Sequence, residues 1–322
     1  MESPPKDNLH WSKRREKASR YGPIKLLLII FKFFPLIILK LFAFPVGFFY
    51  FIFSSSARND PARFLQKALP KGSYRPFGSP LKTIISFSLA LVEKMEAWGG
   101  KYPFKKLHFM EDDITELIDS LEKKKGAVLV CSHLGNAELL RGLANFNLTG
   151  VSRNVPVTAL VDFSVTKNFN RMLEELNPDS KLRLVSVNEI TPSTVISLKE
   201  KLALGELVVI AGDRTSASSP DAVFMLPFLG RDAPFPQGVF ILSLLLEAPV
   251  YTVFALRRGD LSLKGEYGFY VHKNDIEFNC SRQERRAEAR KLALFFVERL
   301  EYYCKKYPHQ WYNFYDFWSK GT

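Results

Sequence analysis

The sequence predicts an α/β domain built on a mainly parallel or mixed sheet with helices on both faces, preceded by an N-terminal hydrophobic helical segment that anchors it to a membrane. Two observations carry this prediction. Beyond residue 81, short apolar runs alternate with helix-like stretches, and between residues 24 and 53 almost every side chain is apolar. Alternating strands and helices are typical of a mainly parallel, two-sided sheet. With 322 residues, 47% of them hydrophobic, the chain is long enough for such a domain and an appendage.

The expected elements follow from the apolar pattern. The short β-type runs are 127–131, 155–161, 182–187, 207–211 and 250–256, followed by an expected antiparallel pair at 261–264 and 268–272. The helix-like stretches are 81–98, 137–145, 165–176, 191–204, 238–246 and 281–305. Because active sites in such sheets lie at the carboxyl ends of the strands, the residues that follow each run are the first candidates for a site.

The expected organisation has four parts. They are a basic segment at 1–23, a membrane anchor at 24–56, a linker at 57–80 and a catalytic domain at 81–322.

Three lysines are the only charged residues between positions 24 and 53. Lys25, Lys32 and Lys40 are spaced by seven and eight residues, which places them on one face of a helix. We expect that face to meet lipid headgroups while Leu, Ile and Phe enter the acyl layer. Basic residues at both flanks favour a monotopic anchor at the cytoplasmic face over a single crossing. The alternative is a buried hairpin that caps the core of a soluble protein.

Charge and cysteine content narrow the class of protein. With 45 Lys and Arg against 33 Asp and Glu, the net charge of +12 suits nucleic acid, an anionic membrane surface or an acidic protein partner. The cations flank an apolar anchor, and no nucleic-acid-binding motif is present. We therefore expect the binding partner to be a membrane surface and not a nucleic acid. Cys131, Cys280 and Cys304 lie far apart and form no C-x-x-C pair, so neither a disulfide framework nor a zinc site is indicated.

The strongest chemical signal follows the run at 127–131. His133 lies at the strand end, Gly135 allows a tight turn, Asn136 is a good helix N-cap, and Glu138 falls in the first helical turn. We expect the His133 imidazole to hydrogen-bond to the Glu138 carboxylate. Such a pair suits hydroxyl acylation, because neutral His takes the proton while the carboxylate fixes its tautomer. The alternative is a histidine satisfied by backbone and a glutamate that serves only the helix dipole.

Two further segments carry candidate substrate-binding residues. The run 207–211 is followed by Asp213 and Arg214, and Arg214 is suited to bidentate contact with a phosphate or carboxylate, or else to a surface ion pair. The segment 228–240 contains Arg231, a further cation, and Gly238, which can start a helix with backbone N–H groups suited to an oxyanion or phosphate. The alternative there is a Pro-rich turn that caps a core helix.

The chain ends in an aromatic-rich tail, HQWYNFYDFW, at 309–318. Such a tail can line an acyl groove, lie at a membrane interface or pack across the sheet.

These motifs resemble the lysophospholipid acyltransferase superfamily, whose hallmark is His, four residues, then Asp or Glu in a strand–loop–helix setting. The motif HLGNAE at 133–138 is most similar to the bacterial lipid A (lauroyl/myristoyl) acyltransferase branch. The segment 208–216 is similar to the family's Arg-containing acceptor motif, but it lacks the proline and glutamate of F-P-E-G-T-R, which argues against a lysophosphatidate acceptor.

The resemblance implies transfer of a fatty acyl group from acyl carrier protein or coenzyme A to a hydroxyl of a lipid or glycolipid. His133 would be the general base, assisted by Glu138, at the cytoplasmic face of a bacterial inner membrane and without a cofactor or metal. The implied substrate-binding residues are Asn136, Asp213, Arg214, Arg231 and Gly238.

Two other functions compete with this one. A catalytically inactive membrane-surface scaffold would keep the fold without the chemistry. A metal-dependent hydrolase built on His133 and Glu138 would need at least one more ligand, which the sequence does not supply at legible spacing.

Overall fold

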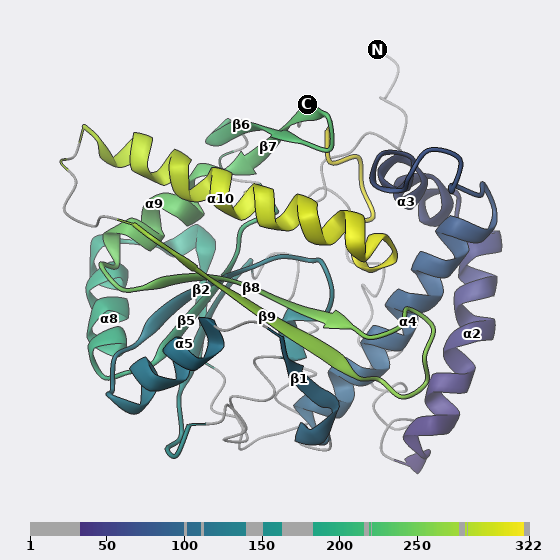
Figure 1. Cartoon of the computed structure of the whole chain (residues 1–322), viewed down its shortest axis with the longest axis horizontal. Helices are drawn as coiled ribbons and strands as arrows, with labels where there is room; N and C mark the ends of the chain where they lie inside the picture. Colours follow the sequence, from purple (N-terminus) through teal and green to yellow (C-terminus); the bar gives the residue numbers. More distant parts are fainter. Residues whose placement is uncertain are drawn as a thin grey trace.

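The computed structural model describes residues 33–99, 102–110, 113–139, 151–162, 183–215, 219, 221–276, 281 and 283–318. These residues form a seven-stranded sheet in the order β1-β9-β8-β2-β5-β3-β4, flanked by helices (Figure 1). Its strands are β1 (Leu107–Phe109), β2 (Ala127–Cys131), β3 (Val157–Val161), β4 (Arg183–Ser186), β5 (Leu207–Ala211), β8 (Val250–Arg257) and β9 (Tyr267–Asn274). The predicted α/β class is confirmed.

The sheet is mixed, with a parallel centre. Strands β8, β2, β5, β3 and β4 run parallel to one another, whereas β9 runs antiparallel to β8 and β1 pairs parallel with β9. The predicted pairing of 261–264 with 268–272 is wrong, because β9 pairs along its whole length with the eight residues of β8. Gly259 and Gly265, both with positive φ, make the segment between these strands a turn.

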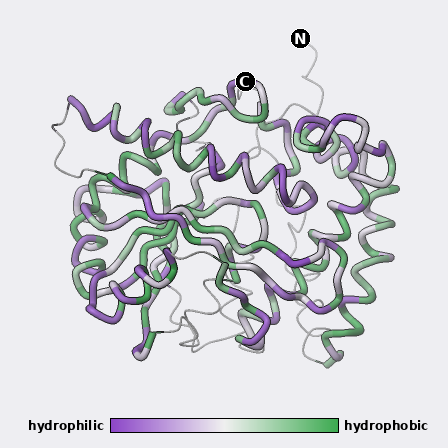
Figure 2. The backbone as a smooth tube through the Cα atoms, viewed as in Figure 1, coloured by the Kyte–Doolittle hydropathy of each residue, from purple (hydrophilic) through white to green (hydrophobic). Residues whose placement is uncertain are grey.

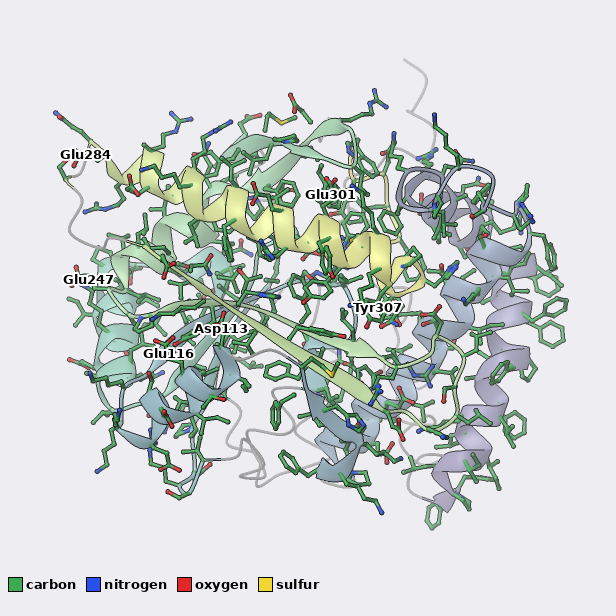
Figure 3. All side chains as sticks on the ribbon, viewed as in Figure 1. Asp113, Glu116, Glu247, Glu284, Glu301 and Tyr307 are labelled. Carbon is green, nitrogen blue, oxygen red and sulfur yellow. The ribbon has the colours of Figure 1, made fainter. Side chains whose placement is uncertain are left out.

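Helices cover both faces of the sheet. They are α4 (Gly78–Trp98), α5 (Asp113–Glu122), α8 (Pro192–Ala203), α9 (Gln237–Leu245) and α10 (Arg285–Lys306), with short 3-10 turns η3 (Phe104–Lys106), η4 (Val187–Glu189) and η5 (Pro308–Gln310). Along β2, Val128 and Val130 join the core beneath α8, α9 and α10, while Leu129 and Cys131 join the core beneath α5. This alternation explains why successive residues of the central strands are hydrophobic, as their colour in Figure 2 shows. Helix α10 crosses its face from the end near Glu284 to the end near Tyr307 (Figure 3).

An antiparallel hairpin, β6 (Val223–Phe228) and β7 (Arg231–Pro236), precedes α9. No strand is predicted from the sequence here, since Pro227, Pro234 and Pro236 discourage one. Proline is tolerated in strands that lie at an edge. A two-stranded hairpin consists of two edges, and the prolines therefore do not prevent it.

Two helices lie at the N-terminal side of the described chain. Helix α2 (Leu36–Phe53) packs along α4, and α3 (Ser55–Ala68) follows after a break at Ser54. Helix α3 occupies much of the segment that was expected to be a linker. By length and composition α2 is able to cross a membrane, and the side of it that faces away from α4 is apolar and exposed.

Lys40 corrects the expectation that three lysines face lipid headgroups. Its side chain is turned toward α4 and is only 4% exposed. Lys25 and Lys32 lie outside the described residues. The face of α2 that carries Lys40 is therefore the face that packs against the protein.

Candidate active site

The turn after β2 brings His133 to the carboxyl edge of the sheet. Gly135 has a φ of 76°, and a Cβ there would lie 2.1 Å from the carbonyl oxygen of Ala255 in β8. The next amide, of Asn136, donates to that same carbonyl at 2.8 Å. Only glycine permits this approach of the two backbones, so the turn is fixed against β8 as the glycine predicts.

The C-terminal tail holds the same turn from the other side. The amide of Gly135 donates to the carbonyl of Gln310 at 2.8 Å, and the amide of Tyr312 donates to the carbonyl of His133 at 3.0 Å. The tail therefore packs across the edge of the sheet, and its backbone belongs to the site.

His133 pairs with Asp213, which lies two residues beyond the end of β5. The imidazole Nδ1 lies 2.7 Å from Asp213 Oδ1, and the backbone N–H of His133 donates to Oδ2 at 2.8 Å. The neighbouring strands β2 and β5 bring the two residues together in register. With the proton on Nδ1, as a carboxylate acceptor requires, Nε2 is the basic ring nitrogen.

Two tail residues complete the surroundings of Asp213. Trp311 Nε1 donates to Oδ2 at 3.1 Å and Asn313 Nδ2 donates to it at 3.2 Å. Arg214 Nε donates in turn to Asn313 Oδ1 at 3.2 Å. Neither Trp311 nor Asn313 is predicted as a site residue from the sequence, where both are part of the aromatic-rich tail. Asp213, expected to bind substrate, is fully buried and instead supports His133.

These contacts set the charges of the pair. Burial alone raises the pKa of Asp213, but attraction to His133, its hydrogen bonds and the Arg214 cation together lower that pKa to about 2. Burial lowers the pKa of His133, the Arg214 cation lowers it further, and Asp213 offsets only part of this effect. At neutral pH the site therefore holds a neutral imidazole beside an ionised carboxylate, the state that a general base requires.

Glu138 lies near His133 but does not take the hydrogen bond expected of it. The Nδ1 of His133 is bonded to Asp213, while Glu138 Oε1 lies 3.8 Å from Lys94 Nζ of α4. The turn directs the first residues of the following helix toward α4, which explains the different partner. Glu138 remains on the wall of the same cavity as His133.

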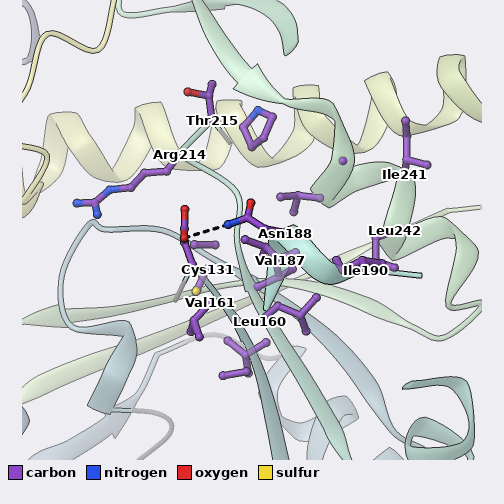
Figure 4. A pocket seen from close by; sticks show the side chains of 18 of the residues that line it. Cys131, Leu160, Val161, Val187, Asn188, Ile190, Arg214, Thr215, Ile241 and Leu242 are labelled. Carbon is purple, nitrogen blue, oxygen red and sulfur yellow. Dashed lines mark hydrogen bonds between the residues drawn. The ribbon is translucent and has the colours of Figure 1, made fainter. Parts of the chain in front are cut away.

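A cavity of about 560 Å³ opens beside His133 (Figure 4). Aliphatic side chains of β3, β5, α8 and α9 form most of its wall, and Leu160, Ile190, Ile241 and Leu242 are visible there. The polar groups His133, Glu138, Arg214 and Thr215 also line it. This volume lies within the range of small-molecule sites, and the composition suits a long apolar chain with a polar reacting end.

The remaining predicted residues lie in three different places. Gly238, at the second position of α9, lines the cavity. Asn136 is buried and its side chain donates to the carbonyl of Ala90 in α4, so it stabilises the turn rather than facing the cavity. Arg231 lies at the start of β7 in a separate cleft of about 340 Å³, whose other lining residues are Arg63, Gln66, Lys67, Asp316 and Trp318.

Within the described residues, no three His, Cys, Asp or Glu side chains are grouped as ligands of a metal ion would be. Cys131 and Cys304 are buried and are not part of a disulfide, and Cys280 lies outside the described residues.

No curated protein matches the chain in sequence. The model of the bacterial lipid A biosynthesis acyltransferase family does match it, over residues 86–320, a span that includes the whole sheet, the His133–Asp213 pair and the cavity beside it. The chain belongs to the bacterial lipid A biosynthesis acyltransferase family.

Proposed function

We propose that this protein transfers a fatty acyl group from an acyl thioester to a hydroxyl of a lipid or glycolipid acceptor at the cytoplasmic face of the bacterial inner membrane. One observation carries the proposal. A neutral histidine, oriented by a buried aspartate, lines an apolar cavity in a member of this family.

The proposed reaction is a direct transfer. Nε2 of His133 takes the proton of the acceptor hydroxyl as its oxygen forms a bond to the thioester carbonyl carbon. The carbon–sulfur bond then breaks, and the departing thiolate receives the proton from the imidazolium. Asp213 stabilises the imidazolium between these two steps, so no enzyme nucleophile is needed.

The other cavity residues have supporting parts in this proposal. The backbone N–H of Gly238 and the Arg214 guanidinium are suited to the oxyanion that develops on the carbonyl. Glu138, ion-paired with Lys94 on the cavity wall, is suited to accept a hydrogen bond from the acceptor hydroxyl and so to orient it. This role differs from direct assistance to His133.

For the donor we favour acyl carrier protein, because acidic carriers complement a chain with a net charge of +12, although coenzyme A is anionic too. For the membrane we propose that the outer face of α2 enters the lipid.

The separate cleft is lined by three cations, Arg63, Lys67 and Arg231, and by one carboxylate, Asp316. This excess of positive charge suits a phosphate group, and we propose that phosphates of the substrate or of membrane lipids bind there.

The test is an acyl-transfer assay with purified protein, labelled acyl carrier protein or acyl-coenzyme A, and lipid extracts as acceptors. We expect a new acylated lipid that His133→Ala fails to make. The same lipid should be missing, by mass spectrometry, from cells that lack the gene. An inactive scaffold is the correct interpretation if no donor is used and the lipids of the two strains are identical.

A further inference from the structure

Helix α2 has a single charged residue, and that residue is buried against the protein. Lys40 Nζ lies 3.2 Å from Glu93 Oε1 and 3.7 Å from Glu96 Oε2, both on α4, and donates to the carbonyl of Leu263 at 3.3 Å. The two carboxylates are at most 4% exposed. An apolar helix whose one cation is buried among carboxylates is joined to its neighbour by more than apolar contact.

Glu93 connects this lysine to the sheet. Its Oε1 also accepts a hydrogen bond from Arg257 Nη2 at 2.9 Å, and its Oε2 accepts one from the hydroxyl of Tyr267 at 2.7 Å. Arg257, at the end of β8, is fully buried. Burial raises the pKa of the nearby Glu96 carboxyl, and the Lys40 cation offsets only part of this rise.

Arg257 connects the cluster to the His133 turn. Its backbone N–H donates to Gln310 Oε1 at 2.8 Å, and its carbonyl accepts from Gln310 Nε2 at 2.8 Å. The carbonyl of Gln310 accepts the amide of Gly135 at 2.8 Å, and the next residue, Trp311, donates to Asp213. Contacts of 3.2 Å or less thus run from α2 to Asp213 and to the turn that carries His133.

We propose that Lys40 is a positioning residue, through which the apolar helix α2 holds the His133 turn in its reactive geometry. This inference rests on the proposed acyl transfer. Removing the cation leaves Glu93 and Glu96 buried with less compensating charge, and buried carboxylates move toward water or take up a proton. Either response displaces α4 and Arg257, and through Gln310 it displaces the turn. Helix α2 is then part of the catalytic structure as well as an anchor.

The first test is Lys40→Met in the full-length protein. We expect kcat to fall about tenfold or more, toward the roughly 10²-fold loss that a misplacement of about 1 Å can cause, with KM for both substrates little changed. Membrane association should persist, because the outer face of α2 is untouched. Lys40→Arg, which keeps the charge, should recover much of the rate. The matched control is Lys291→Met, which breaks an exposed Lys–Glu pair on α10 and should leave kcat unchanged.

A second readout does not depend on the reaction. Hydrogen exchange of a peptide covering 131–139 should be faster in Lys40→Met, and in Gln310→Met, than in wild type or Lys291→Met. Gln310→Met keeps the measurement informative if Lys40→Met fails to fold. Wild-type kcat and wild-type exchange in both variants would overturn the inference, and so would a loss of membrane binding by Lys40→Met with full activity in detergent. Absence of acyl transfer by the wild type would instead overturn the proposed function.

Discussion

At the residue scale, the carboxylate that serves His133 can be identified by comparing two conservative substitutions. Asp213→Asn keeps the size of the side chain but removes the charge that stabilises the imidazolium, so we expect kcat to fall about 10²- to 10⁴-fold. Glu138→Gln keeps a group that can still orient a hydroxyl, and its loss of kcat should be smaller. The comparison requires saturating donor and acceptor. If Glu138→Gln is the more damaging change, Glu138 rather than Asp213 assists the base.

The pH dependence of the reaction follows from the lowered pKa of His133. The active form is the neutral imidazole, so kcat/KM should rise with pH through this pKa and then level off. Because burial and Arg214 lower the pKa, the midpoint of this rise should lie below the usual value of 6.5. Asp213 remains ionised across this range, since its pKa is about 2.

The decisive measurement is kcat/KM for wild type between about pH 4.5 and 8. Arg214→Gln removes one cause of the shift and should move the acid limb upward in pH. A limb centred above 6.5 in the wild type would contradict the proposed electrostatics.

His133 and the glycine turn can be predicted from the sequence, but the partner of the histidine cannot. Glu138 is five residues away and was the nearest carboxylate in the chain, whereas Asp213 is 80 residues away. Only the pairing of β2 with β5 makes them neighbours, and a single sequence does not reveal strand order. Trp311 and Asn313 were hidden for the same reason, because the tail crosses the sheet edge through tertiary packing.

At the scale of elements, the turn that presents His133 depends on the absence of a side chain at Gly135. Gly135→Ala must pay for a left-handed backbone, about 1–2 kcal/mol, and also displace the carbonyl of Ala255. Gly230→Ala is the matched control, because Gly230 has a similar φ of 79° and nothing within 4 Å of the added Cβ.

We therefore expect Gly135→Ala to lower the thermal unfolding midpoint more than Gly230→Ala does, and to abolish most activity. Calorimetry and kcat on both variants provide the measurement. Equal effects would mean that the contact between Gly135 and β8 is unimportant.

The basic cleft between α3, β7 and the tail gives a separate prediction about phosphate. Arg231→Glu changes the local charge by two units, and each basic side chain near an anionic membrane contributes about 1 kcal/mol, so binding to phosphatidylglycerol vesicles should weaken about 30-fold. Arg285→Glu is the control, since it makes the same change at the end of α10 marked by Glu284, on the side of the molecule away from α2 (Figure 3).

Two further results would show what binds in the cleft. A higher KM for a phosphorylated acceptor, with unchanged vesicle binding, would assign the cleft to substrate instead of bulk lipid. An equal loss of vesicle binding in both variants would show that only total charge matters.

The elements themselves were predicted unevenly, and burial explains the difference. The strands β2, β5 and β8 are covered on both faces and have continuous or nearly continuous apolar sequences. The hairpin β6–β7 was missed because its prolines mimic a loop, and the short β1 because three residues give no periodic signal. The expected helix at 165–176 lies outside the described residues.

At the scale of the whole molecule, α2 has two faces in different surroundings. The face with Lys40, Ala43, Gly47 and Phe51 packs on the protein, and the opposite face exposes large apolar side chains to the surroundings. The sequence indicated an anchor, but it could not show which side of the helix met the protein. The buried ion pairs hold α2 against α4, so insertion of α2 into a membrane, as proposed above, would bring the whole domain against that membrane.

The last prediction separates these two faces. Phe42, Val46 and Phe49 are each more than half exposed on α2, and burying such a side chain in an apolar phase contributes about 1.5–3 kcal/mol. Replacing all three by serine should therefore move most of the protein from the membrane to the soluble fraction. Activity on detergent-dispersed acceptor should persist, because these side chains lie outside the core and outside the contacts that reach His133.

The control replaces Ile196, Leu204 and Met225 by serine, three apolar side chains exposed on other elements. That variant should stay with the membrane if attachment is specific to α2. Sedimentation of vesicles and kcat in detergent, measured on both triple variants and on Lys40→Met, give a complete comparison. We expect substitutions on the outer face of α2 to change membrane association, and the substitution of Lys40 on its inner face to change kcat. A triple α2 variant that remains on the membrane would show that the apolar face of this helix is covered by something other than lipid.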